Sequence, residues 1–194
     1  MRLDRTALAL VVAAALALPP AVMAQQPAPA QQAPAQKDQG KGGMAAADRK
    51  FVMEAARGGL AEVELGKLAA EKGSADAVKQ FGKRMADDHA KAAAELKDFA
   101  DKKGMTLPAD LDPKHRQLRD RLAKLTGADF DRAYANEMVK DHKKDVADFK
   151  REAKGAKDPD LKAWAGKTLP TLEDHLKAAQ DVQAQVKSAP RAAR

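Results

Sequence analysis

Cysteine is absent from the 194-residue chain, which excludes disulfide bonds, cysteine-ligated zinc, iron–sulfur clusters and thiol nucleophiles. Aromatic residues make up only 4% of the sequence, whereas hydrophobic residues, about half of them alanine, make up 44%. Such thin apolar side chains favour closely packed helices over a β-sandwich. Four histidines and seven methionines are therefore the side chains that can bind a metal ion through an imidazole nitrogen or a thioether sulfur.

Several catalytic and nucleic-acid-binding patterns are also missing. The sequence has no GxSxG element, phosphate-binding glycine loop or paired catalytic carboxylates, so no catalytic residue is assigned and a non-catalytic protein is favoured over an enzyme. The net charge is +7, but lysines alternate with acidic residues around every predicted helix, as in residues 140–145. Such mixed faces predict no nucleic-acid binding, and at most a weak association with anionic surfaces of the cell envelope.

The N-terminal residues have the pattern of a signal peptide. Two arginines within residues 1–5 precede an apolar run from Ala7 to Leu18, and two prolines separate this run from a small-residue site that ends at Ala24. We predict cleavage after Ala24 and an exported protein that is periplasmic or associated with the outer membrane. An uncleaved anchor is the weaker alternative, because the apolar run is much shorter than the ~20 residues that span a bilayer, and no later segment is apolar enough to span.

The rest of the chain divides into three parts by composition. Residues 25–46 are rich in Gln, Pro, Ala and Gly and lack aromatic residues, which predicts a disordered linker. Residues 47–188 carry helical periodicity and form the predicted domain. Residues 189–194 form a predicted disordered tail.

Glycine and proline breaks divide the predicted domain into four long helices. These span residues 47–72, 75–103, 128–154 and 159–187. Short connections make antiparallel hairpins of the first two and of the last two helices, whereas residues 104–126 form a long connection whose second half is itself helical. Two hairpins joined by such a crossover predict an all-α, ferritin-like four-helix bundle, with a simple up-down-up-down bundle as the alternative. Pro170 predicts a kink or an interruption of the last helix near Thr168.

An apolar stripe with alternating spacings of three and four residues runs along each predicted helix, and one ionisable residue falls inside each stripe. The four residues, in chain order, are Glu62, His89, His142 and His175. At 1.5 Å per residue the three histidines lie at similar heights, while Glu62 lies roughly 7 Å out of level with His89. The sequence therefore predicts that three imidazoles and one carboxylate meet inside the bundle.

Two interpretations of these four buried groups are open, and under both the groups must be paired or metal-bound. In the first, they bind a transition metal, either copper, zinc or iron, and Met85 and Met138, one turn before a histidine, are additional candidate ligands. In the second, the histidines hydrogen-bond to Glu62, to one another or to Tyr134 without any metal. The protein is then a structural or interaction module of the cell envelope, related to envelope stress.

An aspartate directly precedes each of the three histidines. Adjacent residues on a helix point about 100° apart, so Asp88, Asp141 and Asp174 are expected to be flank or surface groups rather than metal ligands. A minor role in supporting the site is assigned to these aspartates and to Tyr134. The Glu-x-x-His pairs of di-iron and di-manganese bundles are absent from the sequence. His115 lies in the basic connection and is assigned no function.

Three histidine motifs together carry a resemblance to a known family. They are F-x3-M-x-x-D-H at residues 81–89, M-x-x-D-H at residues 138–142 and L-P-x-L-x-x-H-L at residues 169–176, accompanied by G-x-x-E-V-x-L-G-x-L-A at residues 59–69. Over about residues 48–187 the chain resembles a bacterial domain-of-unknown-function family of exported ferritin-like bundles, often labelled outer-membrane or periplasmic proteins. The resemblance implies a ferritin-like fold and a location in the cell envelope, and it implies no established activity.

Overall fold

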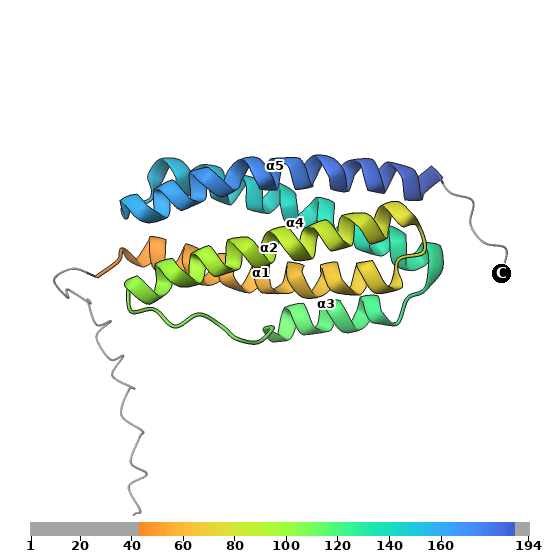
Figure 1. Ribbon diagram of the computed structural model, residues 1–194, viewed down its shortest axis with the longest axis horizontal. Helices are drawn as coiled ribbons and strands as arrows, with labels where there is room; N and C mark the ends of the chain where they lie inside the picture. Colours follow the sequence, from red (N-terminus) through yellow and green to blue (C-terminus); the bar gives the residue numbers. More distant parts are fainter. Residues whose placement is uncertain (1–42, 189–194) are drawn as a thin grey trace, which may run out of the picture. The chain divides into compact units, whose positions relative to one another are not determined.

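Five α-helices and no β-strand make up residues 43–188, the part of the chain that the computed structural model describes (Figure 1). They are α1 (Ala46–Lys72), α2 (Asp76–Lys102), α3 (Pro113–Ala123), α4 (Gly127–Gly155) and α5 (Pro159–Ser188). The predicted all-α class is confirmed, and each boundary of the four long helices lies within one residue of its prediction. The predicted signal peptide, residues 25–42 of the predicted linker and the predicted tail lie outside the described residues.

The long helices form two hairpins. Residues 73–75 join α1 to α2 and residues 156–158 join α4 to α5, and the two helices of each hairpin lie side by side (Figure 1). α3 belongs to the connection between the hairpins and contacts α1 and α4. The hairpins meet through α2 with α5 and through α1 with α4, so the four long helices surround a common interior.

Two buried aspartates fix the relative orientation of the two hairpins. Asp131, near the start of α4, accepts hydrogen bonds of 2.9 and 2.8 Å from the backbone N–H groups of residues 74–75 in the α1–α2 turn. Asp48, near the start of α1, accepts bonds of 2.9 and 2.7 Å from the N–H groups of residues 157–158 in the α4–α5 turn. Each hairpin therefore caps the turn of the other, and α1 runs antiparallel to α4.

The predicted interruption at Pro170 is absent, because α5 continues through this residue. Proline lacks the backbone donor that would bond to the preceding turn. The carbonyl oxygen that Pro170 leaves without this donor is that of Gly166. The hydroxyl of Thr168, two residues before Pro170, donates to the carbonyl oxygen of Trp164 at 2.9 Å. α5 packs along α4, and we attribute its continuity to this tertiary contact, which supplies most of the stability of a helix in a protein.

The core consists of two apolar clusters, one toward each end of the four long helices. One cluster contains Phe81, Phe130 and Tyr134, and the other contains Phe51, Phe149 and Trp164, among other buried side chains. In each helix the predicted ionisable residue falls between the residues of the two clusters, so these residues form a polar layer across the middle. Within residues 43–188, no helix combines the length and the hydrophobicity needed to cross a membrane.

Candidate metal centre

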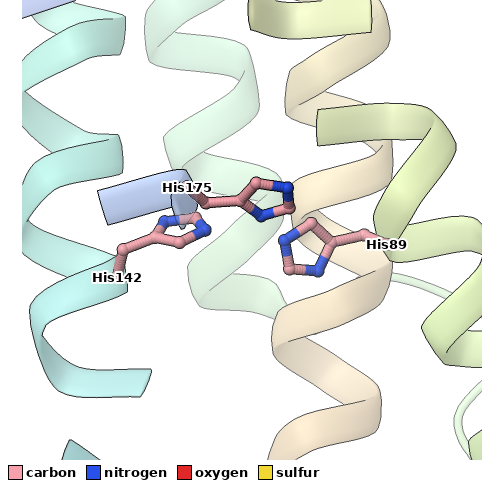
Figure 2. Close-up of side chains that lie close together, drawn as sticks. All are labelled: His89, His142 and His175. Carbon is pink, nitrogen blue, oxygen red and sulfur yellow. The ribbon is translucent and has the colours of Figure 1, made fainter. Parts of the chain in front are cut away.

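The polar layer contains Glu62 from α1, His89 from α2, His142 from α4 and His175 from α5, all of them buried. Figure 2 shows the three imidazole rings pointing toward one another. Their centroids are separated by 5.6, 5.2 and 5.4 Å, and one nitrogen of each ring lies within 4.8 Å of a nitrogen of both others. The four predicted residues therefore meet in the structure.

Glu62 contacts two of the rings through its carboxyl group. Its Oε2 lies 3.1 Å from Nδ1 of His89, and its Oε1 lies 3.5 Å from Nδ1 of His142. Nδ1 of His142 also lies 3.0 Å from the backbone carbonyl oxygen of Met138, one turn earlier on α4. A carbonyl oxygen can only accept a hydrogen bond, so Nδ1 of His142 carries the hydrogen. An ionised Glu62 assigns the hydrogen of His89 to Nδ1 in the same way.

The third ring is held by the aspartate predicted to support the site. Nε2 of His175 lies 3.0 Å from Oδ2 of Asp88, across the α2–α5 interface. Burial alone would raise the pKa of Asp88, but the hydrogen bond with His175 leaves this pKa below its ordinary value. Asp88 is therefore an ionised acceptor, and the hydrogen of His175 lies on Nε2.

The remaining nitrogen of each ring is buried and has no hydrogen-bond partner among the described residues. These atoms are Nε2 of His89, Nε2 of His142 and Nδ1 of His175. In a neutral imidazole with its hydrogen on one nitrogen, the other nitrogen carries a lone pair. When Glu62 is ionised, the layer thus holds three lone pairs in one water-poor region, each on a ring that an oxygen atom orients from its other side.

The surroundings keep the rings neutral. Burial lowers the pKa of His89 well below its ordinary value, and the nearby His142 and His175 lower it further. Burial and the charge of His175 lower the pKa of His142 to about 4. Burial also lowers the pKa of His175, although its bond to Asp88 opposes this change. Neutral imidazole is the form that binds metal ions.

A further carboxyl group, missing from the predicted set, belongs to Asp145 on α4. Burial raises the pKa of Glu62 well above its ordinary value, and the charges of Asp145 and Asp141 raise it further. Burial raises the pKa of Asp145 to about 6, and this group shares a hydrogen bond with Glu62 when one of the two is protonated. The sequence does contain a signal for this pair, since Glu62 follows the capping Asp48 at the same spacing as Asp145 follows the capping Asp131.

The other predicted residues have surroundings that differ from those of the four buried ionisable groups. Met85 and Met138 are fully buried in one apolar cluster, and Met138 contacts His142 through its backbone carbonyl. Tyr134 is in the same cluster, where its hydroxyl has no partner, and burial together with the charge of Glu62 raises its pKa. Asp141 is half-buried beside a cavity that Glu62 also lines, whereas Asp174 is exposed.

The fold and the polar layer define an all-α domain with a buried cluster of three histidines. A sequence model of the family described as Domain of unknown function (DUF4142) matches residues 7–182, so the chain belongs to this family. This match confirms the family type that the motifs predicted.

Among solved structures, one described as "Crystal structure of DUF305 fragment from Deinococcus radiodurans" is similar, with a TM-score of 0.65. It is 13% identical in sequence, and the match covers 74% of this chain and 99% of that chain. At this identity the likeness concerns the helical fold alone. No curated protein matches the sequence.

Proposed function

We propose that His89, His142 and His175 bind a transition-metal ion in an exported, non-catalytic protein of the periplasm or outer membrane. The observation that carries this proposal is the state of the ring nitrogens: on each ring an oxygen atom faces one nitrogen, while the other nitrogen is buried without a partner. In metalloproteins, ligating histidines are oriented in this way by carboxylates and backbone carbonyls behind them. Glu62 and Asp88 then serve as such acceptors rather than as ligands.

A structural histidine network is the alternative, and the contacts of Glu62 with two rings are compatible with it. That network, however, leaves three buried nitrogens unpaired. Each unpaired buried acceptor costs about 1–3 kcal/mol, and three of them facing one another cannot be relieved by hydrogen bonds among themselves, because none carries a hydrogen. A cation bound by all three removes this cost and lowers the pKa of Glu62 by its own charge.

The donor set points to zinc, copper or iron. Neutral imidazole suits all three metals, and by the Irving–Williams order the affinity of a fixed site rises from iron(II) to copper(II). Nitrogens bound to one zinc ion at 2.0–2.1 Å lie roughly 3.4 Å apart, a separation inside the 4.8 Å within which the three ring nitrogens lie. We place Met85 and Met138 in the supporting apolar cluster rather than among the ligands.

The proposed setting is a ferritin-like four-helix bundle. The long connection between two hairpins, the antiparallel α1 and α4, and the family membership support this topology. The proposal of export depends on the charged and apolar N-terminal pattern. Determining the N-terminal residue of the protein purified from the periplasm of its host tests this part, and a protein retained in the cytoplasm with its leader intact contradicts it.

Metal binding is tested by titrating the purified, metal-stripped protein with Co²⁺, Zn²⁺ and Cu²⁺. We expect one ion per chain, a visible absorption band for Co²⁺ and a rise in melting temperature for each metal, because a ligand that binds only the folded state stabilises it. His89→Ala, His142→Ala and His175→Ala should each abolish the response. His115→Ala is the matched control, since His115 lies outside the cluster and pairs with Asp112. A response that survives in the first three variants contradicts the proposal.

A further inference from the structure

A cavity of about 260 Å³ is lined by residues of α1, of α4 and of the start of α3, the short helix that lies alongside α1 (Figure 1). We call it the α3 cavity. Glu62 lines it from α1, Asp141 and Asp145 line it from α4, and His115 lines it from α3. None of the three clustered histidines is part of its wall. The α3 cavity is therefore separate from the candidate metal centre, although Glu62 belongs to both.

Three carboxyl groups gather at the inner wall of the α3 cavity. Asp141 and Asp145 are four residues apart on α4, so they lie on the same face of this helix. The charges of both raise the pKa of Glu62, and Asp145 is close enough to Glu62 to share a hydrogen bond with it. Glu62 is buried, and the two aspartates are half-buried. Negative charge is thus concentrated below the surface, between α1 and α4.

The basic residues of the cavity do not neutralise this charge. Arg57, Lys114 and Lys144 also line the α3 cavity, but all three are exposed, and Lys144 pairs with Asp148 at 2.6 Å. Within residues 43–188, no lysine or arginine forms an ion pair with any of the three carboxylates. Buried charges in proteins are normally paired or coordinate a metal ion. The inner wall therefore lacks a cation.

Glu62 also has an oxygen atom without a hydrogen-bond partner. Its Oε1 is buried, in a residue that is 4% exposed, and accepts no hydrogen bond from any described residue. The 3.5 Å contact of Oε1 with Nδ1 of His142 is not such a bond, since this N–H donates to the carbonyl oxygen of Met138. Buried polar atoms are rarely left unpaired. A cation beside Oε1 supplies the missing partner when Glu62 and Asp145 are both ionised.

The donor atoms and the volume define the kind of cation. Carboxylate oxygens suit Mg²⁺, Ca²⁺ and Mn²⁺, whereas imidazole nitrogens suit zinc, copper and iron. One water molecule needs roughly 10–15 Å³ of cavity, so about 260 Å³ leaves room for an ion together with several of its water molecules. Ions of the Mg²⁺ type keep such water molecules and are often held by only one or two carboxylates.

We propose that the α3 cavity binds a hydrated divalent cation of the oxygen-preferring kind, with Glu62 and Asp145 as direct ligands and Asp141 bound through water. This site is additional to the three histidines, and it does not depend on an ion bound there. Glu62 connects the two sites, because its Oε2 faces the ring of His89 while its Oε1 is free to bind the cation.

The test uses Mn²⁺ as the probe of protein that has first received one equivalent of Zn²⁺, since nitrogen ligands bind zinc more tightly than manganese. Free Mn²⁺ gives an electron paramagnetic resonance signal that bound Mn²⁺ loses, so its decrease counts the bound ions. We expect one Mn²⁺ per chain. Asp145→Asn should weaken binding by about tenfold or more, because the number of charged ligands sets the affinity of such sites. Asp141→Asn should weaken it by a smaller factor.

Glu54→Gln is the matched control, because Glu54 lines the same cavity but is exposed. This variant should bind Mn²⁺ as the wild type does. Circular dichroism of each sample shows that a loss of binding is not a loss of folding. Equal Mn²⁺ binding by the wild type, Asp145→Asn and Glu54→Gln overturns the inference.

His175→Ala separates this site from the candidate metal centre, because His175 contacts Asp88 and does not line the α3 cavity. The variant should lose the response to Zn²⁺ and keep its binding of Mn²⁺. Loss of Mn²⁺ binding in folded His175→Ala overturns the inference, since the ion would then be bound by the rings. A wild type that binds Mn²⁺ but not Zn²⁺ overturns only the metal centre, and one that binds Zn²⁺ but not Mn²⁺ overturns only the cation site.

Discussion

Two stretches of α1 contain glycine in opposite surroundings. At Gly66 an added Cβ would lie 2.7 Å from the carbonyl oxygen of Gly82 and 2.8 Å from the backbone nitrogen of Ala86, both on α2. At Gly58 and Gly59, about two turns earlier, an added Cβ would meet nothing within 4 Å. In the first stretch glycine lets two helix backbones approach each other, and in the second it leaves space beside the polar layer.

The two stretches of α1 therefore have different structural roles. The α1–α2 interface holds the hairpin together, and its glycines are required by packing. The α1–α4 border has fewer direct contacts and is held at its two ends by Asp48 and Asp131. The middle of that border is therefore free to keep a cavity next to Glu62 and His89.

The largest effect is expected where the packing is closest. Gly66→Ala should destabilise the protein by about 3 kcal/mol or more, because the new methyl group meets the backbone of α2 rather than a flexible side chain. Gly82→Ala meets the backbone of α1 and should behave alike. Urea unfolding followed by circular dichroism measures both changes, and a loss below 1 kcal/mol would mean that the two stretches are equivalent.

An intermediate effect is expected at Asp145, on the open border. Its pKa is raised by burial to about 6, so its contribution to stability is fully present below its ordinary pKa of 3.8 and is lost as the pH rises through 6. Asparagine does not titrate. Asp145→Asn should therefore gain stability relative to the wild type between pH 5 and pH 8, by about 1.4 kcal/mol out of the roughly 3 kcal/mol that the whole shift is worth.

Thermal and urea unfolding of the metal-free proteins at pH 5 and at pH 8 measure this gain. Asp174→Asn is the control, because it makes the same change at an exposed aspartate. If the difference between Asp145→Asn and the wild type is independent of pH, the proton shared by Glu62 and Asp145 is disproved.

The smallest effect should have the opposite sign to the first. Gly58→Ala adds a methyl group where no atom lies within 4 Å and replaces glycine inside a helix. We expect a gain of about 0.5–1 kcal/mol, since alanine has the better helix propensity. The same unfolding measurements test it, and a loss of stability would show that the space beside Gly58 is closed to a methyl group.

Much of the helical framework was predictable from local signals. Asp112 and Asp158 each precede a proline at the start of a helix, which is a local capping signal, and each accepts a hydrogen bond from a backbone N–H group three residues later. Ser74 is also a residue type that caps helices, but Ala75 occupies the capping position of α2 and the N–H of Ser74 donates to Asp131. This capping partner comes from the other hairpin, and no pattern of neighbouring residues in the sequence indicates it.

The polar layer was predictable in its members and less so in its geometry. Helical spacing identifies Glu62 as an interior residue but puts it out of level with His89, whereas its carboxyl oxygen lies 3.1 Å from the ring of His89. The stagger of packed helices and the reach of a glutamate side chain account for the difference. Asp145 was missed because its position is read as part of a mixed charged face until α1 packs beside it.

The sequence by itself determines the helices, their hairpin connections and which ionisable residues fall on apolar faces, because these follow from periodicity and from capping over a few residues. Only the tertiary structure decides which nitrogen of each histidine is paired, that Glu62 meets Asp145, and that one glycine of α1 is packed while another borders a cavity. These features depend on distances between helices that are far apart in the chain, and no local pattern specifies them.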